Sequence, residues 1–314
     1  MDIFESKNIS PMLISEMREP FDSQDYIYEL KLDGIRCLAF LDEKGTVLLN
    51  KRNLLVAPIY PELKDINKQV RKRCILDGEI VVINNGKPDF SEIQRRSLMT
   101  NKIKIDLASS KLPVSFIAFD ILYYNDKQIT DMSLMERKES LQAIIEENEK
   151  LAVSRYIEKN GIDFYNLTVK ENLEGIVAKL KDSKYYIGKR TKDWIKIKNL
   201  QDDDFVVCGY ILKENNVTSI ILGQYSDNEL IYKGHVTLGV STFDFNRINS
   251  EQKISYPYIK EIPIGNENAV WIEPNLVCTV KYMTKTQNGG LRQPVFKGLR
   301  HDKEPKECVI RVDL

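Results

Sequence analysis

The chain has 314 residues, 42% of them apolar, which is enough for two domains of ordinary size. No apolar run approaches the ~20 residues of a membrane span, and the N-terminus lacks a signal-peptide pattern, so we expect a soluble, cytoplasmic protein. The formal net charge of zero argues against a protein that coats nucleic acid through overall charge alone.

Cysteine and histidine usage limits the metal chemistry that is open to the chain. Five cysteines are scattered singly without a C-x-x-C pair, which indicates reduced core residues. The two histidines, His235 and His301, are too few and too far apart for a histidine-rich metal site. Any catalytic metal is therefore expected on carboxylates and phosphates, which points to Mg²⁺ or Mn²⁺.

After an irregular entry segment over residues 1–25, the first chemistry-bearing stretch runs from Glu29 to Arg36. Strands are predicted on either side of it, so Asp33 and Gly34 form a tight hairpin turn in this interpretation. Lys31, Asp33 and Arg36 then make a K-x-D-G-x-R cluster. A lysine at a strand end is often just a solvated charge, and that alternative stays open on these residues alone.

The next segments predict a strand with an arginine at its end, a helix and a buried strand. The first strand covers residues 45–50 and leads to Arg52, which is either a ligand-binding or a plain surface residue. Pro61 opens a helix that runs to about residue 73. The β-branched strand over 74–82 carries Asp77 and Glu79 at i and i+2, on one face. Because two buried acids are costly without cations or a metal, we favour a functional role for them.

A short helix around Phe90 is followed by a central strand over residues 114–123. Asp120 is a lone acid inside that strand, and Phe119 faces the opposite side. An aromatic residue in such a strand is more often core than ligand. Ser133 and Glu136 then form a capping box for a scaffold helix that reaches about residue 145.

Two further segments place charged side chains on strands. Glu174 immediately precedes a strand that ends near Lys179. After Arg190, Lys196 and Lys198 alternate with isoleucines, so both lysines project from the same face of a strand. Two amines directed the same way repel each other unless an anion lies between them. This second strand therefore predicts an anion site.

Residues 199–204 are polar and are expected to form a hinge or linker between a first domain over 1–199 and a second over 200–314. The second domain is predicted to be a small all-β barrel of the OB type, because short strands alternate with Gly and Asn turns. Its strands are expected at about 205–213, 217–225, 229–236 and 276–283. The stretch 291–303 is dense in cations and has little secondary-structure pattern.

Six of these stretches occur in the order of the nucleotidyltransferase motifs, namely KLDGIR, LDGEIVV, FIAFDILYY, EGIVAK, DWIKIK and RQPVFKGLRHDK. The whole chain resembles the bacterial ATP-dependent DNA ligases, especially the ligase module of non-homologous end-joining ligases. The resemblance implies an α+β fold. An adenylation (nucleotidyltransferase) domain of antiparallel sheets with helices precedes an all-β OB-fold domain.

The resemblance also implies roles for individual residues in binding ATP. Lys31 would be the adenylated nucleophile, with Asp33 beside it in the catalytic motif. Glu29 would contact the adenine amino group, and Phe119 would stack on adenine, which reverses the core interpretation of Phe119. The remaining residues that would hold the ribose or a phosphate of the nucleotide are Arg36, Arg52, Glu79, Arg190, Lys196 and Lys198.

Metal binding and domain closure follow from the same resemblance. Glu174 would engage the catalytic Mg²⁺ or Mn²⁺, and Glu79 would bind either the ribose or a metal. The cations of the second domain would close over ATP and orient the pyrophosphate leaving group, and they are Arg292, Arg300 and Lys303, with Asp302 among them. The hinge at 199–204 would permit the second domain to reorient between steps.

The activity implied is the sealing of nicks or ends in double-stranded DNA. Lys31 takes AMP from ATP, AMP passes to a 5′-phosphate, and the 3′-OH displaces AMP. The K-x-D-G-x-R core also suits an RNA ligase or a capping-type enzyme, and an OB barrel alone suits a catalytically silent nucleic-acid-binding protein. We expect a monomer that encircles DNA partially or with an end-binding or recruiting protein, since no N-terminal DNA-binding, polymerase or nuclease module is recognisable. Residues 233–239 match the family's glycine-rich loop only loosely.

Overall fold

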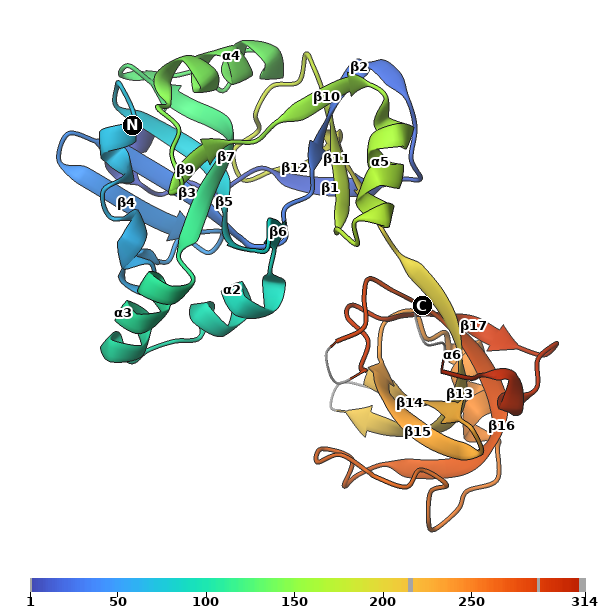
Figure 1. Cartoon of the computed structure of the whole chain (residues 1–314). Coiled ribbons are helices and arrows are strands. Elements are labelled where there is room, and N and C mark those ends of the chain that lie inside the picture. Colours follow the sequence, from blue (N-terminus) through green and yellow to red (C-terminus); the bar gives the residue numbers. More distant parts are fainter. Residues whose placement is uncertain (1, 214–216, 287–288, 311–314) are drawn as a thin grey trace. The chain divides into compact units, whose positions relative to one another are not determined.

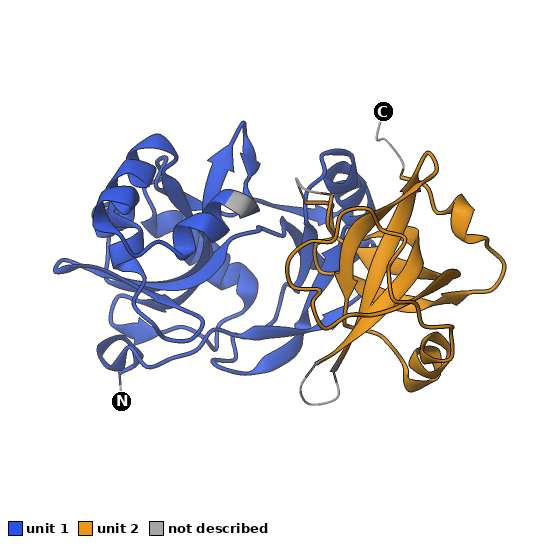
Figure 2. Cartoon of the chain, turned by 90° about the horizontal axis from the view of Figure 1, so that it is seen from below, with its two compact units in different colours: residues 1–199 blue, residues 200–314 orange. Residues whose placement is uncertain are grey.

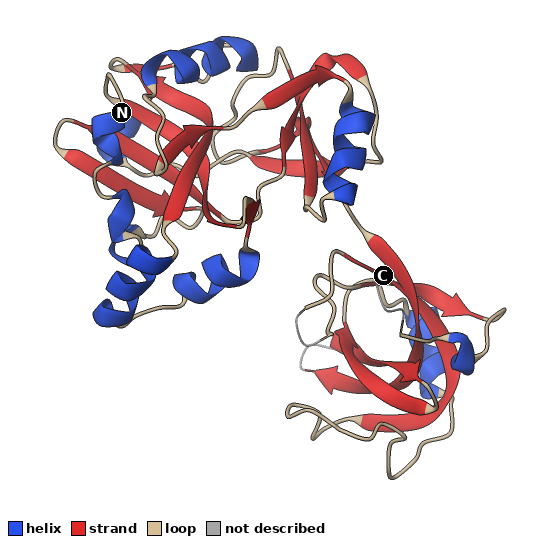
Figure 3. Ribbon diagram, in the orientation of Figure 1, coloured by secondary structure: helices blue, strands red, loops and turns tan. Residues whose placement is uncertain are grey.

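The computed structural model describes residues 2–213, 217–286 and 289–310, and it divides into two compact units, 1–199 and 200–314 (Figure 2). Unit 1 contains two sheets with helices against them, and unit 2 is a single curled sheet (Figures 1 and 3). Within the described residues, no helix is long and apolar enough to cross a membrane.

The seven-stranded sheet of unit 1 begins at the exit from the lysine motif. Its main path, in spatial order, is β4 (Gly45–Asn50), β3 (Ile35–Asp42), β5 (Cys74–Asn84), β7 (Val114–Tyr124) and β8 (Lys127–Gln128). The short strands β6 (Lys87–Pro88) and β9 (Leu151–Val153) pair with β5 and β7. The central strands are largely buried and rich in apolar residues, as expected for strands covered on both faces.

The five-stranded sheet of unit 1 carries most of the remaining motifs. In spatial order it consists of β1 (Leu13–Met17), β12 (Arg190–Lys198), β11 (Gly175–Leu180), β2 (Ser23–Leu30) and β10 (Tyr156–Lys159). Ile27 and Trp194 from this sheet share a buried cluster with Leu38 and Phe40 from the other. This shared core holds the two sheets of unit 1 together.

The helices of unit 1 lie around these sheets (Figure 3). They are α1 (Ile3–Ser6), α2 (Phe90–Ser97), α3 (Lys102–Lys111), α4 (Leu134–Ile144) and α5 (Gly161–Lys170), with 3-10 turns η1 (Ala57–Ile59), η2 (Pro61–Leu63) and η3 (Ile66–Gln69). Helix α4 starts with the predicted capping box, in which Ser133 Oγ and the Glu136 carboxylate each accept from the other's main chain. The predicted α+β class is confirmed, although β1–β12 and β7–β9 pair in parallel.

The hairpin predicted at Asp33 and Gly34 is wrong. Strand β2 pairs with β11 and β10, whereas β3 pairs with β4 and β5, so the segment between them crosses from one sheet to the other. Gly34 makes the crossing possible, because a Cβ there would lie 2.3 Å from the main-chain oxygen of Ile80. The lysine motif therefore lies between two sheets and not at the tip of a hairpin.

The helix predicted from Pro61 to about residue 73 is also wrong, because the segment forms only η2 and η3 before Val70 extends. Tertiary hydrogen bonds compete with helical ones here. The Asn67 side chain donates to the main-chain oxygen of Asp42 at 2.9 Å, and its main-chain N–H donates to Thr46 Oγ1 at 3.1 Å. These bonds tie the segment to the β3–β4 turn.

Unit 2 is an all-β barrel of the predicted OB type. Its sheet runs, in spatial order, through β15 (Glu229–Val236), β14 (Val217–Ser226), β13 (Gln201–Lys213), β16 (Val270–Tyr282) and β17 (Val295–Arg300), with α6 (Thr242–Asn249) and η5 (Pro305–Glu307) outside the strands. Leu238, just past β15, bridges to Val295 of β17, which brings the two edge strands together. The core is apolar, with Phe205, Leu222 and Phe296 among its buried residues.

The hinge predicted over residues 199–204 is much shorter in the structure. Residues 201–204 belong to β13 and pair with β16, so only Asn199 and Leu200 separate β12 from β13. Acidic residues can lie in this strand because the Tyr282 hydroxyl donates to Asp203 and the Thr279 hydroxyl donates to Asp204. The stretch 291–303 was expected to have little secondary structure, and this expectation was wrong because Val295–Arg300 forms β17.

Candidate active site

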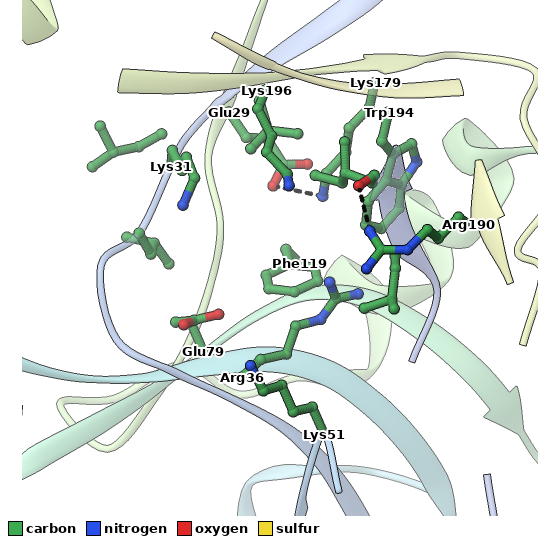
Figure 4. A pocket seen from close by; sticks show the side chains of 15 residues that line it. Glu29, Lys31, Arg36, Lys51, Glu79, Phe119, Lys179, Arg190, Trp194 and Lys196 are labelled. Carbon is green, nitrogen blue, oxygen red and sulfur yellow. Dashed lines mark hydrogen bonds and ion pairs between the residues drawn. The ribbon is translucent and has the colours of Figure 1, made fainter. Parts of the chain in front are cut away.

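A cleft of about 360 Å³ opens in unit 1, with walls from both of its sheets (Figure 4). The predicted site residues that line it are Glu29, Lys31, Arg36, Glu79, Phe119, Arg190 and Lys196. Lys51, Lys179 and Trp194 line it too, and none of these three was predicted as a site residue. Seven positions scattered over 168 residues of sequence are thus gathered around one cavity.

Lys31 is held at the end of β2 by both its main chain and its side chain. Its main-chain N–H donates to the Gly175 oxygen at 2.9 Å, and its Nζ lies 2.7 Å from Glu174 Oε1. Gly175 has a φ of +126°, and a Cβ there would lie 2.1 Å from the Ile197 oxygen. The glycine therefore lets Glu174 approach Lys31 at the point where β11 meets β12.

Two acids face the lysine from different sheets. Burial raises the pKa of Glu174, although Lys31 opposes the shift. Among the residues that the structure describes, one buried carboxylate oxygen of Glu174 has no hydrogen-bond partner. Burial likewise raises the pKa of Glu79 to about 8, against the attraction of Arg36 and Lys31. Carboxylates whose charge is this costly are stabilised by a further cation. The pair thus fits a site for a hard divalent metal, whose ligands are oxygens.

Arg36 is fixed in the floor of the cleft by Asp77. Its guanidinium donates two hydrogen bonds to the Asp77 carboxylate, at 2.9 and 2.6 Å, and the Tyr185 hydroxyl donates to the same carboxylate at 2.6 Å. Burial disfavours the guanidinium charge, but Asp77 outweighs it and raises the pKa of Arg36. Asp77, one of the two acids predicted to need a cation, has therefore found one within the chain.

The aromatic end of the cleft has a buried charge cluster beneath it. Glu29 is 2% exposed, accepts from Ser154 Oγ at 2.8 Å and forms ion pairs with Lys138 at 2.5 Å and Lys179 at 3.1 Å. The Lys179 ammonium also lies 4.4 Å from the ring centre of Phe119 (Figure 4). Burial lowers the pKa of Lys179 to about 8, although Glu29 opposes the shift.

The remaining cations of the cleft favour an anionic ligand. Among the described residues, Lys196 and Arg190 form no ion pair, and Arg190 donates only to the Ile14 oxygen, at 3.3 Å. Burial lowers the pKa of Lys196, and repulsion by Lys31 and Arg190 lowers it further. An anion between these side chains would relieve the repulsion. The cleft thus brings together an aromatic face, a lysine amine and cations without a carboxylate partner. Groups of these kinds suit a site that binds a nucleotide and places its phosphate near the amine.

Some predicted residues lie elsewhere. Arg52 is exposed at the end of β4, and its neighbour Lys51 lines the cleft instead. Lys198 lies 3.9 Å from Glu174 but is not part of the cleft lining. Asp33 lies in the crossing segment and contributes to the raised pKa of Glu174.

Three predicted cations belong to unit 2. Arg292 lies in the segment before β17, and its main-chain N–H donates to the Thr284 oxygen. Arg300 pairs with Asp302 at 2.7 Å, and Lys303 pairs with Asp204 at 2.8 Å. Arg300 and Lys303 are therefore held by carboxylates of their own unit.

Comparison with known proteins identifies the class to which this fold and site belong. Residues 10–198 match the ATP dependent DNA ligase domain, and residues 213–303 match the ATP dependent DNA ligase C terminal region. The chain belongs to the ATP-dependent DNA ligase family. The predicted family, fold class and enzyme class, a DNA ligase that forms phosphodiester bonds, are thereby confirmed, and the RNA-ligase, capping-enzyme and silent-binding alternatives are not favoured.

Individual relatives cover nearly the whole chain. The SPbeta prophage-derived DNA ligase-like protein LigB of Bacillus subtilis is 30% identical over 93% of this chain and 99% of LigB. The multifunctional non-homologous end joining protein LigD of Pseudomonas aeruginosa is 30% identical over 95% of this chain, which spans 36% of LigD. The structure of mycobacterial DNA ligase D complexed with ATP and MES superposes with a TM-score of 0.57 at 26% identity, covering 97% of this chain and 99% of that one.

Proposed function

We propose that this chain seals nicks or ends in double-stranded DNA and that Lys31 is the residue that carries AMP from ATP to DNA. The observation that carries the proposal is the position of Lys31. Its amine lies 2.7 Å from a buried carboxylate, in a cation-rich cleft that Phe119 and Glu79 also line. Amines attack phosphorus only in their neutral form, so a lysine nucleophile has to give up its proton before it reacts.

The chemistry needs three displacements at phosphorus. In the first, Lys31 Nζ forms a bond to the α-phosphorus of ATP, the bond to the bridging oxygen breaks, and pyrophosphate leaves. In the second, a 5′-phosphate oxygen of DNA displaces Lys31 Nζ from that phosphorus. In the third, the 3′-hydroxyl attacks the DNA 5′-phosphorus and AMP leaves, which closes the strand. Each step gathers negative charge that fixed cations stabilise.

The residues of the cleft divide this work by position. Phe119 and Trp194 offer a face for the base, with Glu29 and Lys179 as polar groups beside it. Lys196 and Arg190 are placed for phosphate, and Arg36 for ribose or phosphate. We further assign Arg292, Arg300 and Lys303 of unit 2 to the reaction with ATP, where they would orient pyrophosphate.

A divalent metal, Mg²⁺ or Mn²⁺, would be held by Glu174 and Glu79. The unpaired buried oxygen of Glu174 and the costly charge of Glu79 support this assignment. When bound, such a metal supplies neutralisation of phosphate charge. The macromolecular partner in this proposal is nicked or broken duplex DNA. We also propose that the chain is a monomer and that an end-binding protein recruits it to DNA.

The test is covalent labelling. The wild-type chain incubated with α-labelled ATP and Mg²⁺ should form an acid-labile, alkali-stable lysine adduct, and labelled GTP should not replace ATP. Lys31→Ala and Lys31→Arg should both lose the adduct, because guanidinium stays protonated and cannot attack. Lys102→Ala, which removes an exposed lysine of α3, is the matched control and should label like wild type. Labelling of either Lys31 variant at wild-type yield would refute the assignment.

The substrate is tested with a second assay. Nicked duplexes with all-DNA strands should be sealed, and duplexes with RNA on the 3′ or 5′ side of the nick measure how strictly DNA is required. Efficient sealing of RNA-only nicks together with failure on DNA nicks would contradict the proposed substrate.

A further inference from the structure

Two adjacent carboxylates in β13 of unit 2 have different partners. Asp203 accepts a hydrogen bond from the Tyr282 hydroxyl at 2.9 Å and lies 3.7 Å from Lys285 Nζ. Asp204 accepts a hydrogen bond from Lys303 Nζ at 2.8 Å and lies 3.6 Å from a terminal nitrogen of Arg300. Successive side chains of a strand point to opposite faces, so the neighbours are separated although they share one backbone. Asp204 is the carboxylate that contacts Arg300 and Lys303.

The side chain of Asp204 is itself held in place by the barrel. Asp204 lies opposite Thr279 of β16 in the strand pairing, and the Thr279 hydroxyl donates to Asp204 Oδ1 at 2.6 Å. The main-chain oxygen of Asp204 accepts from the buried amide of Gln224 at 3.1 Å. Burial disfavours the Asp204 charge, but Lys303 and Thr279 outweigh it and lower the pKa of the carboxyl. Asp204 is therefore an ionised, oriented acceptor on a central strand.

The two cations lie at the end of a barrel strand and just beyond it. Arg300 is the last residue of β17, and Lys303 lies at the end of the bends over residues 301–303. The other acid that pairs with Arg300 is Asp302, which is 69% exposed and lies only two residues away, so this pair does not hold the Arg300 side chain against another strand. Exposed ion pairs of this kind also contribute little to stability. Asp204, at 15% exposure, links the side chains of both cations to β13.

We infer that Asp204 is a positioning residue for the reaction of the enzyme with ATP, because it holds Lys303 and Arg300 at a fixed spacing. The inference rests on the proposed function, in which these two cations orient pyrophosphate. Long cationic side chains lose rotamer freedom when they bind an anion, and a carboxylate that already restrains them reduces that loss. A restrained pair also meets the leaving group in one geometry, which is the condition for efficient displacement.

The opposite role would be shielding, in which Asp204 neutralises the cations and must be released before they can act. The two roles differ in the sign of the effect that follows when the carboxylate is removed. Under positioning, the Asp204→Asn variant reacts more slowly with ATP. Under shielding, it reacts faster or binds ATP more tightly.

The experiment compares full-length Asp204→Asn, Asp204→Glu and the matched control Asp203→Asn, which makes the same charge change one residue away. Two steps are measured separately: formation of the lysine adduct with ATP in a single turnover, and sealing of a nick whose 5′-phosphate is already adenylated. We expect Asp204→Asn to slow the first step about tenfold and to leave the second within about twofold. Asp203→Asn should leave both steps at the wild-type rate, and Asp204→Glu should recover most of the first.

A double-mutant cycle with Lys303→Gln keeps the test decisive if one variant is poorly folded. When Asp204 acts through Lys303 as well as Arg300, the loss of adenylation rate in the double variant is smaller than the two single losses combined. Additive losses, equal losses in both steps, or an unchanged or faster first step in Asp204→Asn would overturn the inference. Absence of the lysine adduct in the wild-type chain would instead contradict the proposed function, so the two failures are distinguishable.

Discussion

Replacing Glu29 with glutamine tests the buried charge cluster beside the aromatic end of the cleft. Glu29 pairs with Lys138 and Lys179, and these lysines are only 1% and 3% exposed. Glutamine keeps the size of the side chain and an oxygen that can accept the hydrogen bond from Ser154. The substitution therefore removes the negative charge with little change in packing, and two buried ammonium groups lose their counter-ion.

Two routes bound the cost. Removing one partner of a buried ion pair destabilises a protein by about 3–5 kcal/mol. If Lys179 instead gives up its proton, the cost from its folded-state pKa of about 8 is only about 1.4 kcal/mol at pH 7, at about 1.36 kcal/mol per pH unit. We expect the free energy of unfolding of unit 1 to fall by about 1.4–5 kcal/mol at pH 7.

The loss should depend on pH with a defined sign. The folded-state pKa of Lys179 is already lowered to about 8 in the wild type, and loss of Glu29 lowers it further. The folded variant then binds fewer protons than its unfolded chain over a wider pH range, so its stability rises with pH where that of the wild type is still flat. The difference between the two proteins should shrink as the pH is raised toward 8.

The assay is urea unfolding followed by tryptophan fluorescence. The chain has two tryptophans, Trp194 in unit 1 and Trp271 in unit 2, so a Trp271→Phe background reports on unit 1 alone. Asp106→Asn is the control, because its partner Lys102 is 89% exposed and the pair should contribute less than about 0.5 kcal/mol. A loss below about 1 kcal/mol for Glu29→Gln, or a loss independent of pH, would refute the charge-cluster reasoning.

Three further predictions concern other parts of the chain. Glu174→Ala should weaken metal-dependent adenylation, and unchanged activity with unchanged Mg²⁺ dependence in a labelling titration would place the metal elsewhere. Ser133→Ala should cost about 1 kcal/mol of unit 1 stability in urea, because it removes the cap of α4, and a neutral result would contradict that role. Arg300→Ala combined with Lys303→Ala should abolish lysine labelling by ATP but spare sealing of a pre-adenylated nick. Equal loss of both activities would assign these residues to DNA binding or folding.

Local sequence patterns predicted much of the fold and the chemistry. The strands of the motifs are where the β-branched runs and the alternation of polar and apolar residues place them, and the Ser133 cap begins α4 as predicted. These signals are local, because strand periodicity and capping depend on residues within one element. Helices α1, α3, α5 and α6 were not predicted. The helix predicted after Pro61 does not form, because hydrogen bonds from Asn67 to residues of the β3–β4 hairpin outweigh the local preference for a helix.

The sequence by itself determined the inventory of the proposed site: the lysine that we propose as nucleophile, an aromatic residue, two acids on one strand and alternating lysines. Tertiary structure decided which of these meet and which neighbours join them. Lys179 ends the EGIVAK motif, but the sequence did not indicate which residues it would contact. Its place beside Phe119 arises because β11 pairs with both β2 and β12, and this pairing is set by residues far apart in the chain.

The same reason explains the crossing at Gly34 and the position of Asp204. Strand periodicity fixes the direction of a side chain, but the pairing of strands fixes its surroundings. A turn between two strands looks the same in sequence whether the strands pair with each other or join different sheets. In the sequence, Asp204 belongs to a polar stretch that indicates a linker. In the structure, β13 pairs with β16, and Lys303, which follows β17, contacts Asp204.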